Sequence, residues 1–221
     1  MSAEVRFPCK GVLFDSDGVL VDSDATTYRA WSRWAITYEL DPDAVCAMVH
    51  GRRAVDLVEQ LIEADGRAAA VRVIDAYELE DAASVTPIPG AGALVRALPP
   101  DRWAVVTSAV APLAWARLRA AGIPDPHTLV TADDVIEGKP SPQGYRQAAV
   151  ALGLDPGDTV VLEDAGAGVQ AARAASVGFV VGVGRRALGT GADVVVEDLR
   201  SVRWTAEELV TVPIDGLPVG Q

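Results

Sequence analysis

The chain has 221 residues, half of them hydrophobic, which is enough for one substantial core with an insertion or for two small domains. Its formal net charge of -12 leaves no basic field, so we expect neither a nucleic-acid partner nor a membrane partner. With only two cysteines and no signal segment at its start, the chain is not predicted to be a disulfide-stapled secreted protein, and we expect a cytoplasmic location.

The first predicted strand is the apolar run from Gly11 to Phe14, and two carboxylates, Asp15 and Asp17, follow it at once. Gly18 lets the chain turn sharply away after them. Because ligands of open parallel sheets bind beyond the carboxyl ends of the strands, we expect both carboxylates to face one small site. Such a pair suits a hard divalent cation or a division into nucleophile and acid/base. An exposed acidic turn is the structural alternative.

Residues 24–86 have helical rather than strand periodicity. Their apolar side chains fall at spacings that suit buried helix faces: Trp31, Trp34, Leu57, Leu61 and Ile62. Prolines and a glycine in Thr86–Gly90 mark a return to the first unit. We therefore expect an inserted helical cap over residues 24–86, and a core that is discontinuous in sequence, made of residues 1–23 and 87–221.

The rest of the chain alternates short apolar runs with helical patterns rich in Ala, Leu and Arg. The runs predict five more strands: Trp103–Val106, Thr128–Val130, Thr159–Leu162, Phe179–Val183 and Asp193–Val196. This alternation predicts an α/β fold with a doubly wound, mostly parallel, Rossmann-like sheet. The tail after Glu208 contains two prolines and two glycines, so we expect it to run irregularly over the surface.

Polar residues end two of these strands or lie in a loop near them. Thr107-Ser108 follows the second predicted strand, and Glu163-Asp164 follows the fourth. Lys139, one of only two lysines, lies in the loop Glu137–Pro142. Each also has a structural interpretation: a helix cap for the hydroxyls, favourable helix N-terminal charges for the acids, and a solvated surface lysine. Together with the first acid pair, they favour one catalytic site.

The four motifs in this order resemble those of the haloacid dehalogenase superfamily, across nearly the whole chain. They are Asp15-Ser16-Asp17-Gly18, Thr107-Ser108, Lys139 and Glu163-Asp164. A helical insertion between the first two motifs resembles the subgroup with an α-helical cap, which includes the sugar and polyol phosphatases and β-phosphoglucomutase.

The resemblance implies a role for each motif residue. Asp15 would be the nucleophile that forms an aspartyl phosphate, and Asp17 would be the general acid and then the general base. The phosphate would be bound by Thr107, Ser108 and Lys139. Mg²⁺ would be held by carboxylate oxygens of Asp15 and Asp164 and by the backbone carbonyl of Asp17, with Glu163 supporting these ligands.

The predicted activity is Mg²⁺-dependent hydrolysis of a small sugar or polyol phosphomonoester, so the expected partner is a small phosphorylated metabolite. A mutase of the β-phosphoglucomutase type is one alternative, but that branch carries a histidine where this chain has Thr27. A catalytically silent phosphate-sugar binding protein is the other. We expect a monomer or a weak homodimer.

One segment of the expected cap, His50-Gly51-Arg52-Arg53, resembles the His-Gly-basic turn of helical-capped sugar phosphatases. His50, Arg52 and Arg53 are therefore candidate contacts to the substrate. An ordinary corner between two helices is the alternative interpretation.

Overall fold

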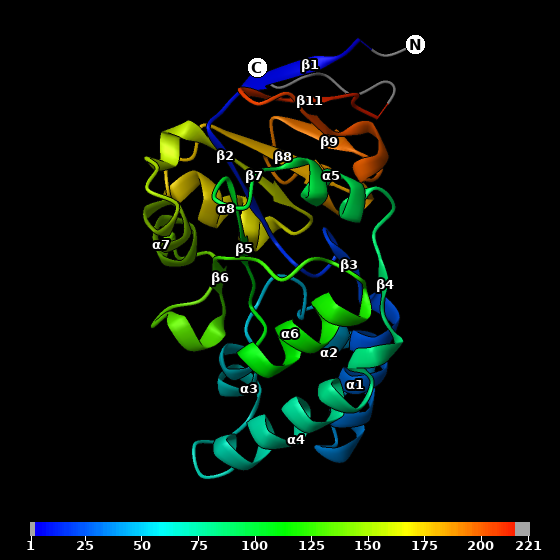
Figure 1. The fold of residues 1–221 in the computed structure, drawn as a ribbon. Coiled ribbons are helices and arrows are strands. Elements are labelled where there is room, and N and C mark those ends of the chain that lie inside the picture. The colour runs from blue at the N-terminus through cyan, green and yellow to red at the C-terminus, as the bar shows by residue number, and fades with distance from the viewer. Residues whose placement is uncertain (1–2, 215–221) are drawn as a thin grey trace.

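A computed structural model describes residues 3–214, and its centre is a parallel six-stranded sheet (Figure 1). The strand order is β6-β5-β2-β7-β8-β9. The strands span Gly11–Phe14 (β2), Trp103–Val106 (β5), Leu129–Val130 (β6), Thr159–Glu163 (β7), Phe179–Val183 (β8) and Val194–Val196 (β9). The predicted α/β fold with a parallel, doubly wound sheet is confirmed.

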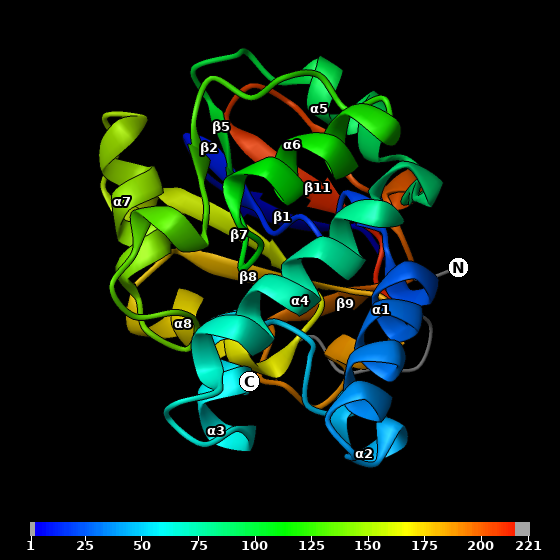
Figure 2. The same cartoon turned by 90° about the horizontal axis from the view of Figure 1, so that it is seen from below.

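The central strands β2, β5 and β7 are buried along their whole length because helices cover both faces of the sheet. The covering helices are α5 (Ala91–Ala97), α6 (Ala111–Ala120), α7 (Gln143–Ala151) and α8 (Gly166–Ala174). Apolar side chains of α5 and α6 pack in the same cluster as Val12 and Phe14, whereas those of α7 and α8 pack with Leu13. Figure 2 shows the two pairs on opposite sides of the sheet. This packing fixes β2 between its neighbours, and with it the start of the acidic turn.

Four helices between β3 and β4 form a helical insert with a core of its own. They span Asp24–Thr37 (α1), Pro42–Cys46 (α2), Ala54–Leu61 (α3) and Arg67–Glu80 (α4). Trp31, Trp34 and Leu57 are buried inside it, as the spacing predicts, and the indole Nε1 of Trp34 donates a hydrogen bond to Ala70 O over 2.9 Å. Within residues 3–214, no helix has both the length and the apolar character needed to cross a membrane.

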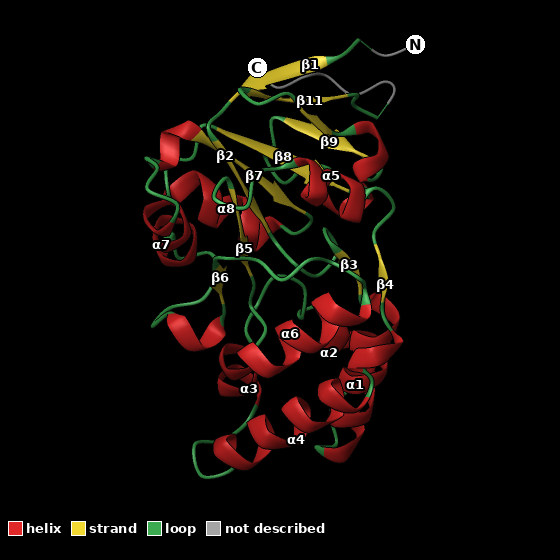
Figure 3. Ribbon diagram, viewed as in Figure 1, coloured by secondary structure: helices red, strands yellow, loops and turns green. Residues whose placement is uncertain are grey.

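The helical insert is joined to the core through a two-stranded ribbon, coloured yellow above the helices in Figure 3. Strand β3 (Val21–Asp22) pairs antiparallel with β4 (Thr86–Pro87), so that Val21 lies opposite Pro87 and Asp22 opposite Thr86. The chain therefore enters and leaves the helical insert at the same place, just beyond the acidic turn.

A small antiparallel sheet corrects the expectation for the tail. Its strands are β1 (Val5–Pro8), β10 (Arg203–Trp204) and β11 (Glu208–Thr211), in the order β1-β11-β10. The expectation of an irregular surface tail is wrong for residues 209–211, because Leu209 is fully buried in the main core and β11 pairs with β1. These strands are too short to give a clear alternating pattern. Residues 215–221 of that tail lie outside the described part of the chain.

Candidate active site

The acidic turn begins where β2 ends. The backbone N–H of Asp15 still donates to Leu162 O of the neighbouring strand over 3.0 Å, so the sheet fixes where its side chain starts. Gly18 then reverses the chain with φ +83° and donates its N–H to Val21 O over 2.7 Å. A Cβ at Gly18 would lie 2.3 Å from Oδ2 of Asp164, so only glycine fits there. The turn after β2 thus packs directly against Asp164, the residue that follows β7.

Lys139 lies in the middle of this site and is buried. Its Nζ donates to Oδ1 of Asp15 and Oε1 of Glu163, both over 2.6 Å, and to Val106 O over 3.2 Å. Burial alone would lower the pKa of Lys139, but the two adjacent carboxylates raise it above its ordinary value. The ammonium group therefore stays protonated and holds one oxygen of Asp15.

Glu163 is fully buried, and both of its carboxylate oxygens accept hydrogen bonds. Its Oε1 accepts from Tyr145 Oη over 2.7 Å as well as from Lys139, and its Oε2 accepts from the backbone N–H of Asp164 and Ala165. A Cβ at Gly168 would lie 1.7 Å from Oε1, so the glycine leaves the space that this carboxylate fills. These contacts fit the supporting role expected of Glu163.

Asp164 is also buried, and its Oδ2 accepts a hydrogen bond from Arg186, which in turn contacts Asp24 at the start of α1. Burial and the neighbouring Glu163 raise the pKa of Asp164 to about 7. Burial also raises the pKa of Asp15 well above its ordinary value, although Lys139 opposes this. The neighbouring cationic side chains therefore do not fully compensate the negative charges of Asp15 and Asp164 when both carboxylates are ionised.

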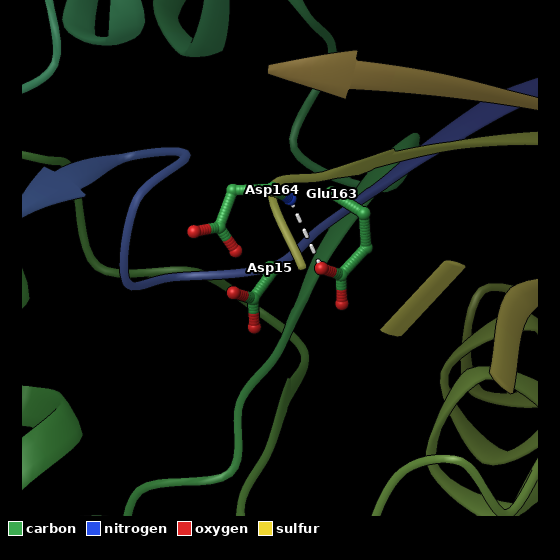
Figure 4. A group of neighbouring side chains, drawn as sticks. All are labelled: Asp15, Glu163 and Asp164. Carbon is green, nitrogen blue, oxygen red and sulfur yellow. Dashed lines mark hydrogen bonds between the residues drawn. The ribbon is translucent and has the colours of Figure 1, made fainter. Parts of the chain in front are cut away.

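Carboxylate oxygens of Asp15, Glu163 and Asp164 lie within 4.8 Å of one another (Figure 4). Hard oxygen donors in a compact group are what Mg²⁺ prefers. Since both oxygens of Glu163 are already engaged, Asp15 and Asp164 are the side chains left to bind a cation, with the backbone carbonyl of Asp17 close in sequence. The donor set fits a divalent metal ion.

A cavity of about 100 Å³ lies between this cluster and the helical insert. It has room for several water molecules, which suits a small ligand. The sequence-predicted residues that line it are Asp15, Asp17, Thr107, Ser108 and Asp164 from the core, and His50, Arg52 and Arg53 from the helical insert. Lys139 lies behind Asp15, so the four motifs do converge on one site.

The hydroxyl-bearing motif joins the core to the helical insert. The Thr107 hydroxyl accepts the backbone N–H of Ala109 over 3.1 Å and keeps its own proton free to donate. The Ser108 hydroxyl donates to Gly51 O of the helical insert over 3.0 Å. The alternative of a plain helix cap does not apply to either side chain, because α6 starts later, at Ala111, with no side-chain cap.

The three candidate residues of the helical insert differ in the hydrogen bonds and salt bridges that they form. Arg53 forms a salt bridge with Asp56 at 2.6 Å and donates to Val135 O of the core over 3.0 Å. Arg52 binds Gln60 on the surface. Burial and the nearby Arg186 lower the pKa of His50, so its imidazole is neutral near pH 7. Of the three, Arg53 is the one tied to the core.

Five further residues of the site did not follow from the motifs: Thr27, Glu78, Tyr145, Arg117 and Arg186. Arg117 did leave a signal in the sequence. It falls four residues after Leu113 and three after Ala114, on the buried face of α6, where an arginine needs a charged partner. Nothing in the sequence indicates which partner that is.

A family model of haloacid dehalogenase-like hydrolases matches residues 9–176. This chain belongs to that family. The match contains all four motifs, and the helices between β3 and β4 place the chain in the subgroup with a helical cap. Its enzyme class is phosphoric monoester hydrolase.

The relatives support the same placement within the haloacid dehalogenase-like hydrolases. Hexitol phosphatase A of Escherichia coli is 45% identical over 76% of this chain and 80% of its own length. The β-phosphoglucomutase of Bacillus subtilis is 30% identical over 85% of this chain and 88% of its own. A hydrolase structure from Pseudomonas syringae has a TM-score of 0.78, at 24% identity, over 86% of this chain and 94% of that one. It supports the fold.

Proposed function

We propose that this phosphatase hydrolyses a small sugar or polyol phosphate, with Mg²⁺ bound, through an aspartyl phosphate on Asp15. The observation that carries the proposal is the buried contact of Asp15 with Lys139 beside the cavity. A carboxylate held by a cation at the carboxyl edge of a parallel sheet is suited to attack phosphorus. The similarity to hexitol phosphatase A supports a polyol or sugar as the alcohol.

Asp15 acts as the nucleophile. Lys139 holds its Oδ1, which leaves the second carboxylate oxygen to attack phosphorus. A bond from this oxygen to phosphorus forms, and the bond from phosphorus to the alcohol oxygen breaks. Lys139 also reduces the repulsion between the carboxylate and the phosphate dianion, because its positive charge lies 2.6 Å from Oδ1 of Asp15.

Asp17 moves the protons. Its side chain is 28% exposed and lines the same cavity as Asp15. A protonated Asp17 gives its proton to the departing alkoxide. The resulting carboxylate then takes a proton from the water that attacks the aspartyl phosphate, which returns both aspartates to their starting states.

Thr107 and the backbone N–H of Ser108 bind the phosphoryl oxygens, since both residues line the same cavity as Asp15. Asp15, Asp164 and the backbone carbonyl of Asp17 would hold a divalent metal ion, which would neutralise phosphoryl charge when bound. We assign residues 24–86 to the helical insert and residues 1–23 and 87–221 to the core. The helical insert excludes bulk water from the site. It also supplies His50 and Arg52 as contacts to the alcohol.

The test is a phosphate-release screen over sugar, polyol and nucleoside monophosphates, with Mg²⁺ and with EDTA. We expect release that needs Mg²⁺ and favours sugar or polyol phosphates. Asp15→Asn removes the nucleophile and should lower the rate by at least about 10³-fold. Asp125→Asn, which changes an exposed aspartate paired with Arg119, is the matched control and should keep the wild-type rate.

Three results would contradict the proposal. Asp15→Asn with full turnover would exclude a covalent role for Asp15. Interconversion of sugar phosphate isomers without free phosphate would identify a mutase instead. Ligand binding with no release from any substrate would identify a silent binding protein.

A further inference from the structure

Arg117 is a buried arginine of the core that contacts the acid/base aspartate. It lies on α6 and is 3% exposed. Its Nη1 donates to Oδ1 of Asp17 over 3.1 Å. Its Nη2 donates to the Thr27 hydroxyl and to Oε1 of Glu78, both over 3.2 Å. One guanidinium group thus joins three different segments of the chain.

Two of these three partners belong to the helical insert. Thr27 is on α1 and Glu78 is on α4, which lies beside α6 in both Figure 1 and Figure 2. A buried guanidinium group is tolerated only when charged partners compensate its lost hydration, and here Asp17 and Glu78 do so. Arg117 therefore keeps its present geometry only while the helical insert rests against the core.

A purely structural link between core and helical insert would not need to touch Asp17. Arg53, which also lines the cavity, makes a link of this kind, because it joins α3 to Val135 O of the core through hydrogen bonds that involve neither Asp15 nor Asp17. Arg117 differs in that its Nη1 fixes one oxygen of the Asp17 carboxylate. The other oxygen of Asp17 is then left in a defined direction beside the cavity that Asp17 lines.

We propose that Arg117 is a positioning residue that orients Asp17 for proton transfer, and that Thr27 and Glu78 hold Arg117 in place when the helical insert is closed on the core. The proton-donating group is therefore ordered only in the closed arrangement. Proton transfer to the alkoxide is in this way coupled to closure around a substrate. The inference rests on the proposed function, because it assigns Asp17 the role of general acid.

The test compares two leaving groups. The best sugar or polyol phosphate from the screen needs a proton on its departing alkoxide, whereas 4-nitrophenyl phosphate releases a stabilised anion that needs none. The ratio kcat/KM covers the steps up to departure of the alcohol. For Arg117→Met we expect kcat/KM to fall at least about 100-fold with the sugar phosphate, and less than about 5-fold with 4-nitrophenyl phosphate.

Three variants complete the design. Arg119→Met changes the next arginine of α6, which is exposed and paired with Asp125. It should leave kcat/KM unchanged for both substrates. Arg117→Lys keeps the charge but replaces the two nitrogens that bind Asp17 and Glu78 separately with one ammonium on a shorter side chain, so its loss with the sugar phosphate should be intermediate. If Arg117→Met does not fold because Glu78 is left uncompensated, Arg117→Met with Glu78→Gln removes both charges and should show the same difference between substrates.

Equal losses with the two substrates, in whichever of these Arg117 variants folds, would overturn the inference and leave Arg117 a structural link. The proposed function would then still stand, provided that the wild-type protein releases phosphate from both substrates. A wild-type protein that releases no phosphate from either would contradict the proposed function, and the inference with it.

Discussion

Each buried charge at the catalytic edge has a neighbour that makes room for it. Two glycines do this most directly, since Gly18 admits Asp164 and Gly168 admits Glu163. The sequence predicted Asp15, Lys139, Glu163 and Asp164 as one group because each follows a strand or lies in a loop at the same sheet edge. It did not predict their hydrogen-bond partners, Tyr145 and Arg186 among them, because partner choice depends on how the helices and loops pack in three dimensions.

Gly168→Ala tests the fit around Glu163. The new Cβ would overlap Oε1, so the carboxylate must move away from Lys139 and Tyr145. We expect the free energy of unfolding to fall by about 1–3 kcal/mol and kcat by at least about tenfold, measured by urea denaturation and phosphate release. Gly166→Ala changes a glycine at the start of the same helix, where a Cβ would lie 3.9 Å from the side chain of Thr190, and should match the wild type. Equal behaviour of the two variants would contradict the argument.

Among the helices and strands, those with the most buried side chains were the easiest to predict from the sequence. The six central strands were visible in the sequence because a strand buried on both faces reads as a continuous apolar run. The strands of the small sheet were missed, since in Val5–Pro8 only alternate residues point inward and the run is four residues long. The helices of the insert were predicted as a group through Trp31 and Trp34, which occupy its separate core.

Trp34→Phe probes that separate core. The change removes the hydrogen bond from Nε1 to Ala70 O and leaves a small cavity between α1 and α4. We expect a loss of about 2 kcal/mol in the free energy of unfolding, and faster amide hydrogen exchange in α1 and α4 than in the central strands. Tyr28→Phe alters an exposed aromatic residue on the same helix and should change stability by less than about 0.5 kcal/mol. Faster exchange spread evenly over the whole protein would count against an independent core.

For the whole molecule, the buried charges at the active site limit stability until a cation binds. Among residues 3–214, the three carboxylates Asp15, Glu163 and Asp164 pair with two cationic side chains, Lys139 and Arg186, and Arg186 also pairs with Asp24. This excess of one negative charge lies within a chain whose overall formal charge is already -12. A bound divalent ion would compensate it, so metal binding and folding stability are linked.

Mg²⁺ should therefore raise the melting temperature. At a concentration near 100 times its dissociation constant, Mg²⁺ adds about 2.7 kcal/mol, or roughly 5–10 °C for a chain of this size. Thermal unfolding with Mg²⁺ and with EDTA measures the shift. Asp164→Asn should abolish it, whereas Asp101→Asn, at an aspartate whose side chain is 74% exposed, should retain it. A shift that survives in Asp164→Asn would place the metal elsewhere.

The ribbon formed by β3 and β4 has a consequence for how such a protein can diversify. Because Asp22 lies opposite Thr86, the two ends of the intervening helices are one strand spacing apart, about 5 Å. A shorter loop or a different set of helices could be joined at these two residues without displacing Asp15 or β2. The part that surrounds the alcohol can therefore be exchanged during evolution while the part that handles phosphorus is inherited unchanged.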